Sequence, residues 1–195
     1  MELSHEIILG SQSPRRAAFL TALGLDFRTL PLDVDESAPD HLSGMEVAAH
    51  VSELKAKALC AHLKSGQLGI TSDTEVWQNN HRFGKPADEA SAREMLEALS
   101  GTSHEVISGL TLVTIDNDTP LLTTETSLVT VYFSEIPDWA MDYYIKHYKP
   151  FDKAGAYGIQ EWIGAGFIDR IEGNYNSVVG LDTAALFRLL LPFRK

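Results

Sequence analysis

The sequence predicts an α/β protein with a mixed β-sheet that is flanked by helices. In its first half, short apolar segments typical of strands alternate with segments of helical periodicity, as in α/β folds. Two long runs dense in β-branched residues follow, at 105–115 and 122–133, and Asp116, Asn117 and Asp118 join them. Because this pair predicts an antiparallel hairpin, the sheet is not expected to be purely parallel.

Composition indicates one globular domain over residues 1–195. Apolar residues make up 44% and charged residues 22% of the chain. A chain of this length buries enough surface to fold without a disulfide or a structural metal. The single cysteine, Cys60, excludes an internal disulfide and fits a reducing compartment. We expect Cys60 to be a small buried hydrophobe and not a nucleophile.

The formal charge of −11 argues against binding of a nucleic-acid polymer, which needs clustered Lys and Arg. A small basic pocket for one nucleotide remains compatible with it. The N-terminus lacks the basic start and long apolar core of a secretory signal. No run approaches the ~20 apolar residues that span a bilayer. We therefore expect a cytoplasmic protein without membrane contact.

The expected helices begin where capping residues precede an apolar stripe. Ser13 and Pro14 suit the N-cap and first position of one helix, and Ser43 with Glu46 has capping-box spacing before the next. The apolar positions that this second helix is expected to bury are Val47, Val51, Leu54 and Ala58. The remaining expected helices are 88–100, 137–148 and 183–191, and the remaining strands are 6–10, 26–32, 68–73 and 167–171.

The segment 11–16 lies where the first strand turns into a helix. A helix N-terminus attracts anions through its unpaired N–H groups and partial positive charge. Ser11 and Ser13 add hydroxyls there, and Arg15 and Arg16 add guanidiniums that suit phosphate oxygens. Basic residues in a first turn oppose the helix dipole, so we favour an anion site over an ordinary solvated cap.

Three further segments carry polar groups, each with an ordinary alternative. Asp73 is expected at the end of an apolar strand, where a carboxylate is held rigidly, but capping explains it better when it is taken alone. Lys85 is a cation on a stiff Gly/Pro loop or a plain exposed lysine. The small residues of 152–160 allow close approach of a ligand or form a simple loop.

Metal ligation from histidine is not expected, because no pair of the 7 histidines has the spacing of a zinc site. The acidic stretch 33–36 contains carboxylates that could help hold a hard cation such as Mg²⁺. A solvated acidic loop is the alternative.

In this order, the segments resemble the Maf family of nucleoside triphosphate pyrophosphatases, from Ile8 to about Leu181. Each segment is weak evidence alone, whereas the ordered set is specific. The segments that carry the resemblance are 11–16, Asp35-Glu36, Lys55-Ala56, 72–74, 84–86, 99–106, 152–160 and 173–181.

The resemblance implies an elongated mixed sheet in two lobes with a central cleft, as in Maf and ITPase-like proteins. It implies hydrolysis of a nucleoside triphosphate to the monophosphate and pyrophosphate with a divalent metal, Mg²⁺ or Mn²⁺. Asp73 takes the place of the catalytic acid, Lys55 and Lys85 those of catalytic cations, and Glu36 joins Asp73 toward the metal. The substrate-binding positions implied are Ser11, Ser13, Arg15, Arg16, Thr74, Lys153 and Gln160.

Within the family, the branch similar to dTTP/UTP pyrophosphatases is marked by Arg15, Thr74 and Gln160. Since the branch acting on 7-methyl-GTP usually has Gln at the position of Thr74, the resemblance favours dTTP, UTP or a modified pyrimidine nucleotide. Departures from the family pattern stand at Val51-Ser52, Ser72, Glu75 and Asp182. Of these, Glu75 places an extra acid near Asp73, which would alter metal binding or base preference unless its side chain points to the other face of the strand.

The residues fit such chemistry, because Arg15, Arg16, Lys55 and Lys85 can offset the charge of a triphosphate. An aspartate is a weak base toward bulk water, so Asp73 is expected to act with the metal, as base, ligand or both. We expect five residues that are far apart in the chain to converge in one groove: Arg15, Lys55, Asp73, Lys85 and Gln160. The alternative is a nucleotide-binding regulator of cell division or septum formation with little catalysis. Family analogy suggests a homodimer.

Overall fold

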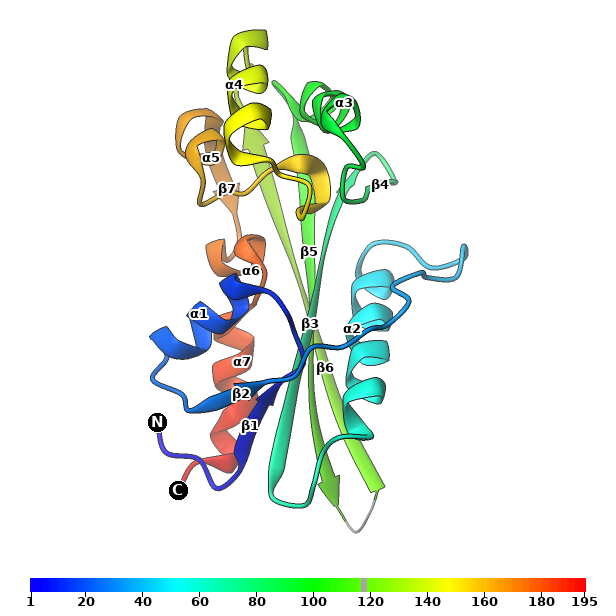
Figure 1. Ribbon diagram of the computed structural model, residues 1–195, viewed down its shortest axis with the longest axis vertical. Helices are drawn as coiled ribbons and strands as arrows, with labels where there is room; N and C mark the ends of the chain where they lie inside the picture. Colours follow the sequence, from blue (N-terminus) through cyan, green and yellow to red (C-terminus); the bar gives the residue numbers. More distant parts are fainter. Residues whose placement is uncertain (117–118) are drawn as a thin grey trace. The chain divides into compact units, whose positions relative to one another are not determined.

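The computed structural model describes residues 1–116 and 119–195 (Figure 1), so the predicted turn at Asn117 and Asp118 lies outside the described residues. The described strands form a mixed seven-stranded sheet in the order β2-β1-β3-β5-β6-β7, with β4 paired to β3. The strands are β1 (Glu6–Leu9), β2 (Phe27–Thr29), β3 (Gln67–Gln78), β4 (His81–Phe83), β5 (Ser103–Asp116), β6 (Thr119–Phe133) and β7 (Ile168–Glu172). Pairing is parallel from β1 to β2 and β3, and antiparallel from β3 to β4 and from β6 to β7. The predicted mixed α/β fold is therefore confirmed.

Helices connect these strands. The α-helices are α1 (Pro14–Ala22), α2 (Met45–Cys60), α3 (Glu89–Leu99), α4 (Asp138–Tyr148), α5 (Trp162–Phe167), α6 (Tyr175–Val179) and α7 (Thr183–Leu190). Short 3-10 turns cover Ala154–Ala156 and Leu191–Phe193. The sequence did not predict α5 and α6, which are short, or the three-residue strand β4. None of the helices in the described ranges is both long and apolar enough to cross a membrane.

The chain divides into two compact units. Unit 1 comprises Met1–Asp73, Ser108–Ser127 and Gly180–Lys195, and unit 2 comprises Thr74–Ile107 and Leu128–Val179. Strands β3, β5 and β6 therefore contribute residues to both units.

In unit 1, the alternation of side chains along β1 divides the apolar core between two faces of the sheet. Ile7 and Leu9 pack with Leu20 of α1 and Leu186 of α7, whereas Ile8 packs against α2 together with other apolar residues. Neighbouring residues in a strand point to opposite faces. Helices α1 and α7 thus cover one face and α2 covers the other (Figure 1).

In unit 2, one apolar core joins α3, α4 and α5 to the sheet. Val129, Val131 and Phe133 of β6 belong to it. The N-cap of helix α3 is Asp88, whose carboxylate accepts a hydrogen bond from the Ser91 N–H in a capping box. At the turn between β3 and β4, Asn79 and Asn80 have φ of 50° and 62°, a conformation that Asn tolerates in tight hairpins.

Two predictions about local structure were wrong. Strand β3 does not end at Asp73 but continues to Gln78, because Val76, Trp77 and Gln78 pair with β4. Helix α2 has Gly44 as its N-cap, and only half of the predicted capping box forms, with Glu46 accepting from the Ser43 N–H.

The face that α2 buries also differs from the prediction. Leu54 and Ala58 are only half-buried, whereas Ser52, Lys55 and Leu59 are buried. Cys60 is half-buried and not fully buried, and desolvation raises the pKa of its thiol, as expected for a packing residue. A polar stripe containing Ser52 and Lys55 therefore faces the sheet.

Candidate functional site

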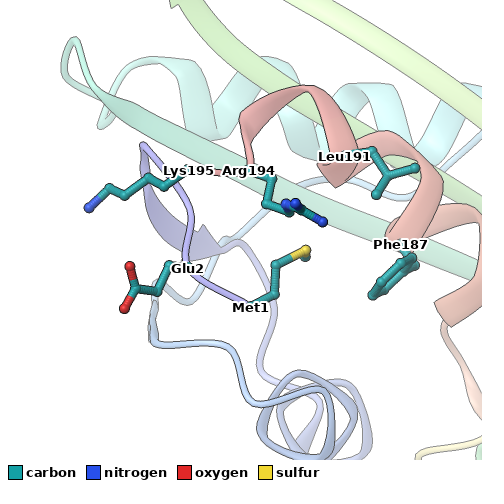
Figure 2. Close-up of a pocket in the computed structure, with 6 residues that line it drawn as sticks. All are labelled: Met1, Glu2, Phe187, Leu191, Arg194 and Lys195. Carbon is teal, nitrogen blue, oxygen red and sulfur yellow. The ribbon is translucent and has the colours of Figure 1, made fainter.

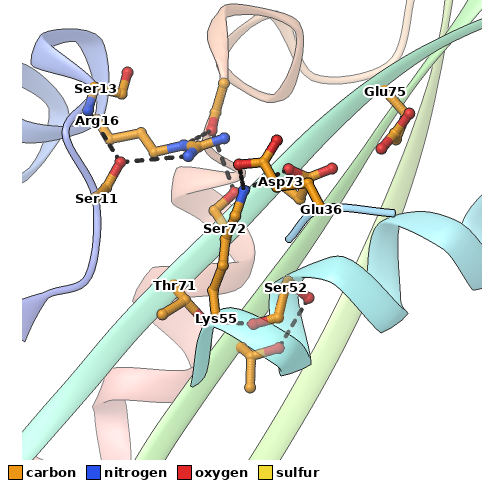
Figure 3. A network of polar contacts seen from close by, with 12 residues as sticks. Ser11, Ser13, Arg16, Glu36, Ser52, Lys55, Thr71, Ser72, Asp73 and Glu75 are labelled. Atoms are coloured by element: carbon orange, nitrogen blue, oxygen red, sulfur yellow. Dashed lines mark hydrogen bonds and ion pairs between the residues drawn. The ribbon is translucent and has the colours of Figure 1, made fainter. Parts of the chain in front are cut away.

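Lys55 of α2 lies between two carboxylates of unit 1. Its Nζ is 2.7 Å from Oδ1 of Asp73 on β3 and 2.9 Å from Oε1 of Glu36 in the loop before α2 (Figure 3). The Lys55 and Asp73 side chains are 11% and 9% exposed, whereas that of Glu36 is 43% exposed. A buried ammonium in contact with two carboxylates lowers the cost of holding their negative charges together. The structure thus brings together Glu36, Lys55 and Asp73, as the sequence predicted.

Contacts one turn earlier on α2 fix where Lys55 reaches the sheet. The Thr71 hydroxyl on β3 donates to the Ser52 carbonyl at 2.8 Å, and the Ser52 hydroxyl lies 2.9 Å from the Thr111 hydroxyl on β5. At Gly109, a Cβ would lie 2.1 Å from the Ala48 carbonyl oxygen. Helix α2 therefore rests directly on the backbone of β5, which only glycine permits.

Arg16 joins the start of α1 to two other segments of unit 1. Its Nε donates to the Gly180 carbonyl at 2.8 Å, and its Nη1 donates to Oγ of Ser11 at 3.4 Å. Ser72 also donates to the Gly180 carbonyl, at 3.3 Å (Figure 3). This shared acceptor links the first turn of α1 to the residue that precedes Asp73.

The electrostatics of Arg16 relate it to the same carboxylates. Burial lowers the pKa of Arg16, the negative charges of Asp73 and Glu36 oppose that shift, and the neighbouring Arg15 reinforces it. We call Ser11, Arg16, Glu36, Lys55 and Asp73 the Asp73 cluster.

The helix start itself has the features of an anion site. Ser13 is the N-cap of α1 and Pro14 its first residue, and the first turn holds no acidic residue. The Ser13 side chain makes no capping hydrogen bond, and its N–H donates to Oγ of Ser11 at 3.1 Å. Arg15 and Arg16 lie in this turn and are half-buried. The turn therefore carries positive charge beside the carboxylates of the cluster.

The arrangement can hold a divalent cation only with help from other ligands. Among the residues that the structure describes, no group of three His, Cys, Asp or Glu side chains could hold a metal. Mg²⁺ commonly binds one or two protein carboxylates, with phosphate oxygens and water completing its ligands. The pair formed by Glu36 and Asp73 fits that pattern.

The other predicted site residues belong to unit 2. Thr74 is half-buried on β3, and Lys85 and Gln160 are exposed in loops. The Gly84 carbonyl, next to Lys85, accepts from the Gly155 N–H at 3.1 Å. This bond joins the Lys85 loop to the segment that carries Lys153 and Gln160. Convergence of these residues with the Asp73 cluster stays a prediction.

Two charged residues of unit 2 have specific partners. The Glu75 carboxylate makes a two-point ion pair with Arg82 of β4, at 2.5 and 2.6 Å. The Arg82 guanidinium thus offsets the negative charge of Glu75, the extra acid that departs from the family pattern. The Lys153 Nζ is 2.7 Å from Asp152 and 3.1 Å from Glu161. The family resemblance implied that Lys153 binds substrate, but no feature of the sequence indicated its ion pair with Glu161.

A separate pocket of about 460 Å³ lies in unit 1 beside the chain termini (Figure 2). It is lined by Met1, Glu2, Phe187, Leu191, Arg194 and Lys195. None of the predicted site residues lines this pocket, so we assign it no part in the chemistry.

The class of protein follows from the fold and from the Asp73 cluster: a mixed α/β protein with an acid–lysine–acid group beside a basic helix start, suited to a polyphosphate and a hard cation. The family described as Maf-like protein matches residues 6–193. The chain belongs to this family.

Curated relatives cover nearly the whole chain. A protein of Flavobacterium johnsoniae named dTTP/UTP pyrophosphatase is 42% identical over 95% of this chain and 94% of its own. One of Bacteroides fragilis with the same name is 42% identical over 95% of each chain. The solved structure of the Staphylococcus aureus Ham1 protein aligns over 66% of this chain and 71% of its own, with 15% identity and a TM-score of 0.42.

Proposed function

We propose that this protein hydrolyses dTTP and UTP, or a modified pyrimidine nucleotide, to the monophosphate and pyrophosphate. The observation that carries the proposal is the contact of Lys55 with both Glu36 and Asp73, next to the basic first turn of α1. Relatives of about the same length that are named dTTP/UTP pyrophosphatase support the choice of substrates.

In this proposal, the residues of unit 1 act on the triphosphate. Ser11, Ser13, Arg15 and Arg16 bind phosphate oxygens at the start of α1. Lys55 holds Asp73 in place and offsets charge that develops on the phosphate. Asp73 accepts the proton of the attacking water.

A divalent cation, Mg²⁺ or Mn²⁺, would be held by Glu36 and Asp73 and would supply Lewis-acid stabilisation and a more acidic water. Asp73 remains the residue to which we assign proton transfer, and its contact with Lys55 keeps the carboxylate oriented. In the overall reaction, water adds to the α-phosphorus, pyrophosphate leaves, and one proton is released.

The residues of unit 2 contribute to binding and selectivity. Lys85 and Lys153 stabilise the leaving pyrophosphate, and Thr74 and Gln160 contact the pyrimidine base, whose edge offers both donors and acceptors to an amide. The single Maf-like domain over residues 1–195, the cytoplasmic location and the homodimer belong to the same proposal.

The test is a panel of nucleotides incubated with the protein and Mg²⁺ in ¹⁸O-labelled water. We expect pyrophosphate from dTTP and UTP in preference to purine nucleotides, with the label in the monophosphate because attack is at the α-phosphorus. Label in the pyrophosphate, or release of orthophosphate alone, would contradict the proposal. Tight binding without any product would select the regulator of cell division or septum formation.

A further inference from the structure

A buried tyrosine of unit 2 holds the segment around Gln160 at two points. Tyr144 lies on α4 and is 0% exposed. Its hydroxyl accepts a hydrogen bond from the Gly158 N–H at 3.0 Å and donates to Oε2 of Glu161. The Tyr144 hydroxyl thus links the backbone of Gly158, two residues before Gln160, to the side chain of Glu161, the residue after it.

Glu161 is held at its other oxygen as well. Its Oε1 is 3.1 Å from the Nζ of Lys153, which is itself 9% exposed. The Glu161 N–H donates to the Gly158 carbonyl at 3.0 Å and closes a turn over 158–161. Tyr144 and Lys153 therefore fix both carboxylate oxygens of the residue that ends this turn.

Gln160 is exposed, and the turn decides where its amide points. A Cβ at Gly158 would lie 2.8 Å from Nε2 of Gln160 and 2.9 Å from Cδ of Glu161. The Gln160 amide thus lies against Gly158, and its position depends on the turn that Tyr144 holds.

The Tyr144 hydroxyl is a permanent donor in this network. Burial, followed by the hydrogen bond and negative charge of Glu161, raises the pKa of Tyr144 well above its ordinary value. The hydroxyl therefore keeps its proton throughout the pH range in which the protein would work, and the contact with Glu161 persists there.

We propose that Tyr144 and Glu161 are positioning residues for base selection, because they hold the turn that orients Gln160. This inference rests on the proposed function, in which Gln160 contacts the pyrimidine base. A glutamine that selects a base through hydrogen bonds discriminates only while its amide is held in one orientation.

The direct test is Tyr144→Phe, which removes only the hydroxyl. We expect the ratio of kcat/KM for UTP to that for GTP to fall about tenfold, mainly through a higher KM for UTP, with kcat for UTP changing less than about threefold. A role confined to general stability would lower kcat/KM for both nucleotides alike and would leave their ratio unchanged.

Tyr148→Phe is the matched control. Tyr148 lies one turn further along α4, is 39% exposed, and stacks on Tyr144 with ring centroids 5.0 Å apart. The chemical change is identical, and we expect the UTP:GTP ratio to stay as in the unaltered protein. Glu161→Gln keeps an acceptor for Tyr144 but removes the charge facing Lys153, so it should give an intermediate ratio.

Hydrogen exchange at 158–161 gives a second readout that needs no turnover. Exchange should be faster in Tyr144→Phe and unchanged in Tyr148→Phe, because only the first loses the bond to the Gly158 N–H. Faster exchange with an unaltered UTP:GTP ratio would overturn the inference and leave the proposed function standing.

Failure of the proposed function gives a different result. If the unaltered protein releases no pyrophosphate from any nucleotide, the ratio is measured by calorimetry as the Kd for GTP over the Kd for UTP. A tenfold fall of that ratio in Tyr144→Phe alone would support base selection without catalysis. An equal ratio in both variants, or no preference for UTP in the unaltered protein, would overturn the inference.

Discussion

Lys55 has surroundings unlike those of an ordinary, exposed helix lysine. It is buried on α2 and touches Asp73 and Glu36 through a single ammonium group. Removal of one partner of such a group leaves a buried charge without compensation, which costs more than loss of an exposed ion pair. The stability of unit 1 and the proposed chemistry therefore depend on the same side chain.

Lys55→Met should lower the free energy of unfolding by about 3 kcal/mol at pH 7, because the buried carboxylate of Asp73 loses the ammonium group that contacts it. Urea unfolding measures the loss. Addition of Asp73→Asn should restore part of it, with a coupling free energy above about 0.5 kcal/mol. Strictly additive losses would show that the two side chains do not interact.

Residues of the Asp73 cluster were predictable from the sequence, but their partners were not. Ser11, Arg16, Glu36, Lys55 and Asp73 stand in recognisable segments. In contrast, the Gly180 carbonyl that receives both Arg16 and Ser72 is a backbone group and has no signature of its own. Tyr144 and Glu161 were missed because only tertiary packing brings α4 beside the 158–161 turn.

The contact of helix α2 with strand β5 fixes the position from which the Lys55 side chain extends. The Ala48 carbonyl lies where a Cβ of Gly109 would be. Hydroxyl groups tie α2 to the neighbouring strands: the half-buried Thr124 hydroxyl on β6 lies 3.0 Å from that of Thr111 and donates to Glu53 of α2 at 2.9 Å. A shift of α2 away from the sheet would break this chain of hydrogen bonds and move Lys55.

Gly109→Ala should therefore lower the free energy of unfolding by about 2 kcal/mol or more and reduce activity, because α2 must move outward to admit the methyl group. Chemical denaturation and a pyrophosphate assay measure the two effects. Gly166→Ala is the control: nothing lies within 4 Å of the added Cβ, and the residue is in helix α5. It should leave stability unchanged or raise it slightly. Equal losses in both variants would contradict this account of α2.

Helices and strands with clear periodicity were predicted well, and short elements were not. Ser13 was predicted as the N-cap of α1 and is its N-cap, and the expected helix 88–100 starts one residue before α3. The end of β3 was misjudged because Thr74–Gln78 mixes polar and apolar residues, and its pairing with β4 depends on a hairpin built by Asn79 and Asn80. Helix α5 contains two glycines in six residues, so its intrinsic propensity is low.

For the whole molecule, His104 makes stability depend on pH. It is buried in unit 2, with its Nε2 2.7 Å from the Tyr157 hydroxyl and its ring stacked on Phe133. Burial lowers the pKa of His104 to about 4, from an ordinary value of 6.5. As the pH falls, His104 of the unfolded chain therefore binds a proton near pH 6.5, whereas His104 of the folded chain binds it only near pH 4.

Stability should accordingly be fully present above pH 6.5 and fall as the pH drops toward 4, with His104 contributing about 3 kcal/mol of the loss. His104→Gln should lack that share of the loss. Unfolding free energies of both proteins between pH 4 and 7 measure the difference. Parallel curves would mean that His104 is not neutral in the fold.

The overall architecture was predictable because the alternation of segments and the hairpin pattern fix a mixed sheet. The ordered motifs, and not any one of them, identified the family, which the match over residues 6–193 confirms. The division into two units was not readable from composition, since β3, β5 and β6 pass through both without any break in their sequence pattern.

In the proposed reaction, Asp73 carries out pyrophosphate-releasing hydrolysis while Lys55 holds it in place. The most direct test is the rate of pyrophosphate release from dTTP by the unaltered protein and by Asp73→Asn, with Asp26→Asn, an exposed residue, as the control. We expect a loss of at least ~100-fold for Asp73→Asn with dTTP binding retained, and an unchanged rate for the control. Release by Asp73→Asn at the unaltered rate would contradict this expectation.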